Sequence, residues 1–338
     1  MKFILWGLSY IYRLGLEEVK LAYRVGIIRQ DRLAQPVISI GNITWGGAGK
    51  TPLVEYLARY LKEHKCHPAV LTRGYMGEAQ RSSDDSGESD EALMLRDNLK
   101  DVPVICGKNR IESAQKVPAG YPADVFILDD GFQHWRLKRD LDIAVIDATN
   151  PFGNRHLLPR GILREPVSSL KRADVLVLTK TDLAQDRLTE LRNALKRINP
   201  QALIVQTVHQ PLNLEELRRR GSFKDLTSLR NKRVCACCSI ADPAAFMTTL
   251  RSCGAEIVGT FEFIDHHRYT PQDVDRMVRF CRDHQASVLV TTQKDAVKLT
   301  PLLQNAEHGL EFWSLRIQIS VVQVKEEFLN KIQQVCRN

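Results

Sequence analysis

Residues 38–52, ISIGNITWGGAGKTP, constrain the fold of this chain more than any other stretch. An apolar run, a cluster of glycines, Gly-Lys-Thr and an amphipathic segment at 53–61 follow one another without a gap. Glycines let a backbone turn its N–H groups toward an anion, because residues without a Cβ adopt such turns at little cost. A glycine-rich turn that binds nothing is the alternative, but the order of strand, loop and helix predicts a P-loop that holds nucleotide phosphates.

Within this loop each residue type has a defined task. Lys50 supplies a positive charge for the phosphates, and Thr51 offers a hydroxyl to Mg²⁺. The usual motif has glycine at the position of Thr44, and we expect Gly46 and Gly47 to replace it. The predicted nucleotide-binding residues are Thr44, Gly46, Gly47, Ala48, Gly49, Lys50 and Thr51.

A second apolar run, residues 125–128, ends in Asp129 and Asp130. A carboxylate at the end of a neighbouring strand can hold Mg²⁺, directly or through water, opposite Thr51. Adjacent side chains of a strand point to opposite faces. We therefore expect one carboxylate at the metal and the other among the groups around the γ-phosphate, and the sequence leaves open which is which.

From residue 36 onward, strand-like and helix-like runs alternate, which predicts an α/β fold with a parallel sheet covered by helices. The predicted strands are residues 37–40, 69–71, 102–106, 125–128, 143–146, 175–178, 203–208, 233–237, 256–263 and 288–291. We place the domain boundary near residues 182–200. This gives a P-loop domain of residues 31–185 and a second, smaller α/β domain of residues 186–338. The C-terminal helix, residues 326–335, could pack on either domain.

Residues 1–30 read as a separate amphipathic helix. Arg13 interrupts the apolar residues before the roughly 20 that a membrane span requires. One helical stripe is polar and contains Ser9, Arg13, Glu17, Lys20 and Arg24. The remaining wide face is apolar and includes Trp6, Tyr10 and Tyr12. Such a helix can lie in a membrane interface or pack on the domain core, and the pattern fits both.

Composition narrows the class of partner. The 338 residues carry a formal net charge of +8, which fits an anionic partner such as nucleic acid, a phosphorylated substrate or a membrane surface. Eight cysteines are scattered through the chain. Three of them, Cys235, Cys237 and Cys238, lie in one strand-like run with no paired Cys or His motif nearby, so we expect reduced thiols of a cytosolic protein.

Other polar residues follow predicted strands. Arg73 comes at the sheet edge of the phosphate loop, where it could contact phosphate. Ser89 and Asp90 precede a helix-like segment, and the local pattern favours a helix cap for Asp90 over a catalytic role. The basic, proline-containing residues 156–166 form either a solvated loop or a clamp for an anionic substrate. Residues 179–182, Thr-Lys-Thr-Asp, are similar to the guanine-reading Asn-Lys-x-Asp motif of GTPases.

Taken together, the motifs resemble the tetraacyldisaccharide 4'-kinase family, the lipid A pathway kinases of Gram-negative bacteria. The resemblance runs from residue 1 to about residue 300, and its specificity comes from the combination of motifs. The segments that carry it are residues 41–42, 46–52, 71–75, 89–91, 129–134, 158–161, 163–166, 265–267 and 294–295. It implies a P-loop kinase, peripheral on the cytoplasmic face of the inner membrane, that uses ATP and Mg²⁺. The implied reaction phosphorylates the 4'-hydroxyl of a lipid A disaccharide 1-phosphate.

The resemblance also implies roles for individual residues. Asp90 becomes the candidate base, with His266 as its orienting partner and His267 as the weaker choice, and Lys50 completes the catalytic set. Asp129 and Asp130 match the acidic pair near Mg²⁺. The candidate substrate contacts are Arg73, Glu91, Gln133, His134, Arg160 and Glu165. Trp45 and Ala48 depart from the smaller or hydroxyl residues expected in the loop.

Three other functions compete with this interpretation. A GTPase of the metallochaperone type would use the double glycine and residues 179–182, but it lacks the Asn and a metal-handling cluster. A nucleic-acid-dependent ATPase would use the positive charge, but aromatic residues interleaved with basic ones are not evident, so we expect no nucleic-acid partner. A membrane-bound scaffold without activity is the third.

Overall fold

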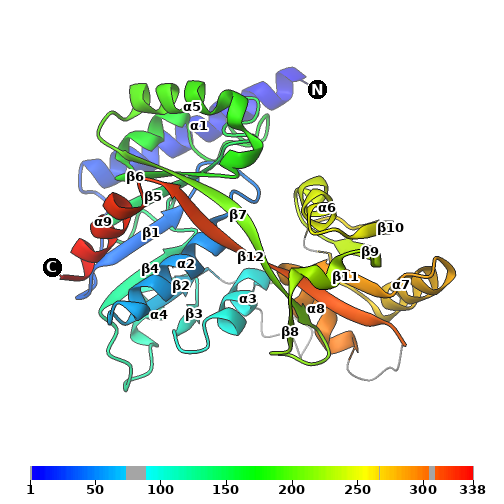
Figure 1. Cartoon of the computed structure of the whole chain (residues 1–338). Helices are drawn as coiled ribbons and strands as arrows, with labels where there is room; N and C mark the ends of the chain where they lie inside the picture. The colour runs from blue at the N-terminus through cyan, green and yellow to red at the C-terminus, as the bar shows by residue number, and fades with distance from the viewer. Residues whose placement is uncertain (1, 74–88, 266, 304–308, 338) are drawn as a thin grey trace. The chain divides into compact units, whose positions relative to one another are not determined.

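The computed structural model describes residues 2–73, 89–265, 267–303 and 309–337. The chain divides into two compact units (Figure 1). The first unit is Met1–His209 together with Ile319–Asn338, and the second is Gln210–Gln318. Two long strands, β7 (Leu203–Glu216) and β12 (Glu311–Gln323), each contribute residues to both units.

The first unit is built on a parallel sheet with the strand order β7-β6-β5-β1-β4-β2-β3. Its strands besides β7 are β1 (Val37–Gly41), β2 (Pro68–Thr72), β3 (Val104–Cys106), β4 (Val125–Asp129), β5 (Leu141–Asp147) and β6 (Val175–Thr179). Its helices are α1 (Lys2–Arg24), α2 (Lys50–Glu63), α3 (Asp90–Asn98), α4 (Arg110–Gln115), α5 (Gln185–Ile198) and α9 (Lys325–Arg337). The central strand β1 is fully buried and pairs with β4 and β5, which puts its end at Gly41 in the middle of the sheet edge.

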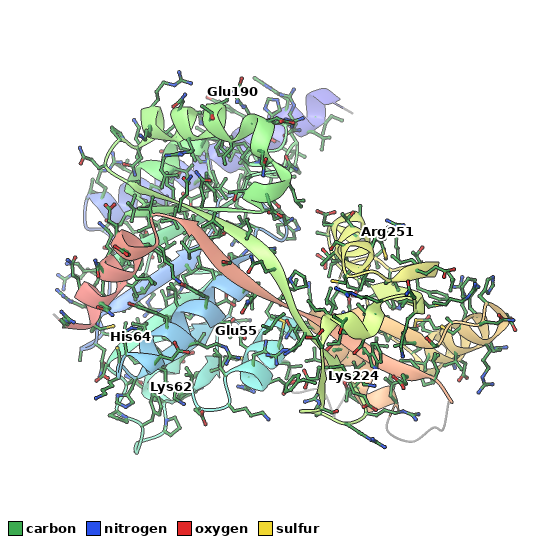
Figure 2. The ribbon with its side chains drawn as sticks, viewed as in Figure 1. Glu55, Lys62, His64, Glu190, Lys224 and Arg251 are labelled. Atoms are coloured by element: carbon green, nitrogen blue, oxygen red, sulfur yellow. The ribbon has the colours of Figure 1, made fainter. Side chains whose placement is uncertain are left out.

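Both faces of this sheet are covered by helices. On one face Leu53 and Leu57 of α2 and Phe328 of α9 pack on the sheet, while Lys62 and His64 at the other side of α2 are exposed (Figure 2). On the other face α5 packs into a cluster that also takes Tyr12 and Leu16 of α1.

The second unit has a smaller parallel sheet of the order β10-β9-β11-β12. Its further strands are β8 (Phe223–Lys224), which pairs antiparallel with β7, β9 (Arg233–Cys238), β10 (Glu256–Glu262) and β11 (Val288–Thr292). Helices α7 (Pro271–Asp283) and α8 (Gln293–Leu303) pack on one face, and α6 (Pro243–Ser252) packs on the other. Cys235, Cys237 and Cys238 of β9 are buried free thiols, as predicted.

The predicted fold class is confirmed, but the boundary between the units differs from the expected residues 182–200. Helix α5 packs on the first sheet, and Val175–Leu178 of β6 pair with Leu203–Gln206 of β7, so the first unit continues to His209. The helix that could have packed on either domain, α9, packs on the first unit through Phe328, Ile332 and Val335.

Candidate active site

The phosphate loop lies between β1 and α2, as its sequence predicts. Gly46 and Gly49 have φ angles of 110° and 83°, a region that L side chains rarely adopt. A Cβ on Gly49 would also lie 2.8 Å from Nε2 of His209, so this position needs glycine for two reasons. Gly49 is the N-cap of α2 and places no side chain over the helix N-terminus, which leaves the backbone N–H groups of the first turn for an anion.

Lys50 points toward the acidic end of β4. Its Nζ donates a hydrogen bond to Oδ1 of Asn42 at 3.2 Å and lies 3.4 Å from Oδ1 of Asp130. The same carboxylate accepts two bonds from Nη1 of Arg164, at 2.9 and 3.0 Å. Burial opposes the ionisation of Asp130, but Lys50 and Arg164 outweigh it and hold its pKa below the usual value.

Asp129 lies in a different environment from its neighbour. It is 4% exposed, and its Oδ2 accepts a hydrogen bond of 3.2 Å from Thr72, whereas its buried Oδ1 has no hydrogen-bond partner among the described residues. Burial and the charge of Asp130 raise its pKa to about 6. Asp130 is thus neutralised by protein cations, and Asp129 is the carboxylate with an oxygen left for a ligand.

Two basic side chains near this pair keep unsatisfied nitrogens. Arg110, the first residue of α4, is 2% exposed, and its Nη1 donates to the carbonyl of Gly107 at 2.7 Å. Nε of Arg110 and Nε2 of His134 are buried without a hydrogen-bond partner among the described residues. Burial, then the charge of Arg110, lowers the pKa of His134 to about 4, so this imidazole is neutral at pH 7. Burial also lowers the pKa of Arg110, against the charges of Asp129 and Asp130.

Arg110 was not among the site residues predicted from the sequence. A signal was present, because Arg110 follows β3 after a short loop and the carboxyl ends of parallel strands meet at one edge of the sheet. The surrounding residues belong to no phosphate motif, however, and a basic residue in the first turn of a short helix usually indicates a solvated surface. Its burial and its proximity to Asp129 depend on how the sheet assembles.

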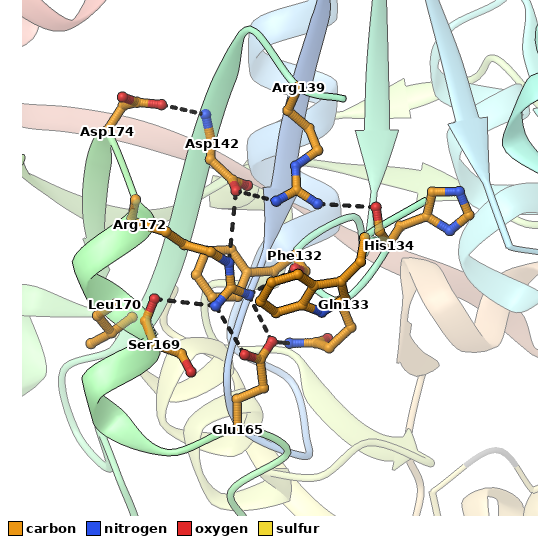
Figure 3. Close-up of polar contacts among 12 residues, drawn as sticks. Phe132, Gln133, His134, Arg139, Asp142, Glu165, Ser169, Leu170, Arg172 and Asp174 are labelled. Atoms are coloured by element: carbon orange, nitrogen blue, oxygen red, sulfur yellow. Dashed lines mark hydrogen bonds and ion pairs between the residues drawn. The ribbon is translucent and has the colours of Figure 1, made fainter. Parts of the chain in front are cut away.

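Glu165 and Gln133 belong to a buried network rather than to an open surface (Figure 3). The carboxylate of Glu165, 0% exposed, accepts bonds from Arg172 at 2.7 and 2.9 Å and from Nε2 of Gln133 at 3.0 Å. The amide of Gln133 also donates to the carbonyl of Asn42 at 2.8 Å. Burial opposes ionisation of Glu165, but the bonds from Arg172 dominate and lower its pKa.

Asp90 and Glu91 form the first turn of α3, and the helix cap is Ser89. The Oγ of Ser89 accepts the N–H of Ala92 at 3.2 Å, so the cap role weighed for Asp90 belongs to its neighbour. Asp90 and Glu91 are both partly exposed, and the charge of Glu91 contributes to the raised pKa of Asp129. Arg73 lies at the end of β2, with an exposed side chain.

Of the two predicted histidines of the second unit, His266 lies outside the described residues. The ring of His267 stacks on Phe263 with a centroid distance of 4.3 Å, and its Nε2 lies 3.2 Å from Oδ2 of Asp273. Asp273 itself forms the capping box of α7 with Thr270. His267 is therefore engaged in the local structure of its own unit.

The Thr-Lys-Thr-Asp segment, residues 179–182, contacts the phosphate loop through Thr179. The hydroxyl of Thr179 donates to the carbonyl of Ala48 at 3.0 Å, and Nζ of Lys180 lies 2.7 Å from Oδ2 of Asp147. Of the two departures from the expected loop composition, Ala48 is buried and Trp45 is 69% exposed.

Helix α1 has an unusual distribution of polarity. Its polar residues Ser9 and Lys20 face the protein, whereas large apolar side chains on the other side are exposed. The exposed set in this helix is Ile4, Trp6, Leu8, Tyr10, Ile11, Leu14, Val19 and Leu21. Tyr12, which we expected on that apolar face, is half-buried and faces the protein. Among the described residues, no helix has both the length and the apolar character needed to cross a bilayer.

Comparison with known proteins assigns the chain to a family. The family model described as Tetraacyldisaccharide-1-P 4'-kinase matches residues 1–337. The chain belongs to this family. Curated family members named tetraacyldisaccharide 4'-kinase include one from Halothermothrix orenii, 36% identical over 94% of this chain and 89% of the relative, and one from Anaeromyxobacter dehalogenans, 41% identical over 84% and 78%.

A solved structure of the same family has the same fold. LpxK from Aquifex aeolicus, crystallised in complex with ATP, superposes with a TM-score of 0.76 at 26% identity, covering 99% of both chains. The family assignment confirms the resemblance found in the sequence motifs and does not support the metallochaperone-type GTPase.

Proposed function

We propose that this chain transfers the γ-phosphate of ATP to the 4'-hydroxyl of a tetraacylated lipid A disaccharide 1-phosphate, forming lipid IV-A. The contact that carries the proposal is Lys50 beside Asp130 at the open N-terminus of α2, since this is a site for nucleotide phosphates in a chain of this kinase family. Phosphoryl transfer depends mainly on positioning and on stabilising charge, and the P-loop amides and Lys50 supply both.

Mg²⁺ fits the residues at the carboxyl end of β4. The unpartnered Oδ1 of Asp129 and the hydroxyl of Thr51 are oxygen ligands of the kind that Mg²⁺ takes, with phosphate oxygens and water completing the shell. Bound Mg²⁺ would neutralise charge on the transferred phosphate. Between the two carboxylates we assign the metal to Asp129, because Asp130 is occupied by Lys50 and Arg164.

Asp90 is our candidate for the base that accepts the proton of the sugar hydroxyl. Ser89 rather than Asp90 is the N-cap of α3, so the helix-cap interpretation no longer competes with the catalytic one for Asp90. His266 is the proposed orienting partner. The involvement of His267 with Phe263 and Asp273 makes it the weaker choice.

Several basic or polar groups could receive the substrate. Arg73, Glu91, His134 and Arg160 remain candidates for direct contact, and the buried Arg110 joins them as a donor near the reacting phosphate. We propose a supporting role for Gln133 and Glu165, because both carboxylate oxygens of Glu165 accept bonds from Arg172 and Nε2 of Gln133 donates to Asn42 and Glu165.

We further propose that the exposed apolar face of α1 lies against a membrane, on the cytoplasmic side of the inner membrane where the lipid substrate would be. The face presents Trp6, Ile11 and Leu14 at 58%, 65% and 48% exposure, which is the pattern of a helix that lies in an interface.

The direct test incubates the purified chain with labelled ATP or GTP and a detergent-dispersed tetraacyldisaccharide 1-phosphate. Label should move from ATP to the 4' position in a Mg²⁺-dependent way. Absence of labelled lipid, with hydrolysis of GTP instead, would contradict the proposal.

A further inference from the structure

The polar side of α1 is bonded to the segment 157–165, which carries two of the basic residues of the site. Oγ of Ser9 donates to the carbonyl of Leu157 at 2.9 Å and accepts the N–H of Arg160 at 3.2 Å. One helical turn further along, the hydroxyl of Tyr12 donates to the carbonyl of Arg164 at 3.0 Å. These bonds join residues more than 140 positions apart, so they fix the helix in one register on this segment.

The segment in turn lies along the first residues of the phosphate loop. Thr44 and Leu163 form an antiparallel bridge. On either side of it the N–H of Trp45 donates to the carbonyl of Ile162 at 2.6 Å, and the N–H of Arg164 donates to the carbonyl of Ile43 at 2.7 Å. The backbone of Arg164 is thus held between Tyr12 on one side and the phosphate loop on the other.

The side chain of Arg164 links its backbone to Asp130 and, through Asp130, to Lys50. Its Nη1 makes both bonds to the carboxylate of Asp130, and that carboxylate lies 3.4 Å from Nζ of Lys50. The hydroxyl of Tyr12 is therefore connected to the lysine of the phosphate loop through the backbone and side chain of Arg164 and the carboxylate of Asp130. Lys20, further along the helix, also contacts this region of the chain. Its Nζ donates to Oγ of Ser169 at 3.0 Å and lies 3.6 Å from Oε2 of Glu165.

We propose that Tyr12, assisted by Ser9, is a positioning residue for phosphoryl transfer: it sets the backbone of Arg164 and thereby the Arg164–Asp130–Lys50 arrangement. This inference rests on the proposed kinase activity. It gives α1 two separate faces, an apolar one for the lipid surface and a polar one that orients the phosphate site. Apolar contacts alone would hold an amphipathic helix against the protein without fixing its register. The hydrogen bonds of Ser9 and Tyr12 to three backbone groups of segment 157–165 fix that register.

The test compares two tyrosines of the same helix. Tyr12→Phe removes the hydroxyl that holds Arg164 and keeps the ring. Tyr23→Phe is the matched control, because its ring stacks on Trp135 with a centroid distance of 6.2 Å and its hydroxyl makes no hydrogen bond within the described part of the chain. With saturating ATP and lipid acceptor in mixed micelles, we expect Tyr12→Phe to lower kcat about five- to tenfold, the equivalent of one hydrogen bond. KM for the acceptor and binding to phosphatidylglycerol vesicles should match those of Tyr23→Phe, while Tm should fall by no more than the loss of one hydrogen bond, about 1 kcal/mol, accounts for.

A coupling measurement separates positioning from simple helix docking. In an Arg164→Ala background, Tyr12→Phe should lower kcat no further, because the group that it positions is gone. Equal kcat for Tyr12→Phe and Tyr23→Phe, or full additivity with Arg164→Ala, would overturn the inference. A loss of Tm or of vesicle binding with normal kcat would also overturn it. Failure of the unmodified chain to phosphorylate the acceptor would instead refute the proposed function.

Discussion

At the scale of single residues, the two adjacent aspartates at the end of β4 have opposite electrostatic environments. Asp130 gains two cations, whereas Asp129 loses solvent and gains a negative neighbour, so their pKa values move apart. The sequence predicted an acidic pair near a metal but could not divide the roles. Arg164, whose bond to Asp130 underlies the proposed division, is 34 residues away in the chain, and no local pattern connects the two.

This separation predicts opposite pH effects on stability. The pKa of Asp129 is raised to about 6, so its ionisation destabilises the fold as pH rises from about 4 to 6, by up to about 3 kcal/mol at pH 7. Asp129→Asn should therefore raise the free energy of unfolding at pH 7 and change little near pH 4. Asp130 has a lowered pKa, so its ionised form stabilises the fold above pH 4, and Asp130→Asn should be destabilising at pH 7. Urea unfolding at both pH values checks this, and a shift of the same sign in the two variants would contradict it.

Lys50 is the simplest residue to test. Its Nζ lies 3.4 Å from the carboxylate of Asp130, and we propose that its charge also acts on the nucleotide phosphates. Lys50→Ala should lower kcat by about three orders of magnitude or more while Tm changes by a few degrees, because the interaction is strongest in the transition state. Normal turnover of the Lys50→Ala variant would contradict a role of the phosphate loop in catalysis.

At the scale of secondary structure elements, local patterns predicted what local forces decide. The glycine loop, the strand that precedes it and the helix that follows are contiguous in sequence, and they were predicted correctly. The polarity of α1 was harder to predict. Of its polar stripe, Arg13, Glu17 and Arg24 are exposed, whereas Ser9 and Lys20 bond to the Leu157 carbonyl, the Ser169 hydroxyl and the Glu165 carboxylate. Polar residues on a helix normally indicate its solvent side, and tertiary partners reverse that interpretation for these two residues.

Helix α3 offers a comparison between a cap and its neighbour. Ser89→Ala removes the bond to Ala92 and should cost about 1 kcal/mol of stability with modest loss of kcat. Asp90→Asn keeps the cap, and if Asp90 is the base it should lower kcat by about two orders of magnitude or more with little change in Tm or in KM for ATP. Measuring Tm and kcat on both variants decides between the roles, since a stability loss with normal turnover in Asp90→Asn would exclude it as the base.

At the scale of the whole molecule, the sequence predicted two α/β units and their order. The boundary between the two units was placed too early. The sequence of the charged helix at 185–198 does not show which sheet the helix covers, and this helix packs on the sheet of the first unit. The return of α9 to the first unit is equally non-local: Phe328 and Ile332 are apolar at helical spacing, which predicts a buried face but not the sheet that buries it.

The final prediction concerns the outer face of α1, where contact with the membrane is proposed. Ile11→Glu places a charge at a position that is 65% exposed and should cost the isolated chain little stability. On vesicles of phosphatidylethanolamine and phosphatidylglycerol it should weaken binding. The apolar side chain that is proposed to enter the membrane interface is replaced by a negative charge, which the anionic surface repels. KM for a micellar lipid acceptor should rise several-fold, while kcat at saturation stays close to that of the unmodified chain. Arg24→Gln at the end of the helix lowers the net charge by the same one unit and provides a control for charge alone. Vesicle binding that is unaffected by Ile11→Glu, or weakened equally by Arg24→Gln, would mean that this apolar face does not enter the interface.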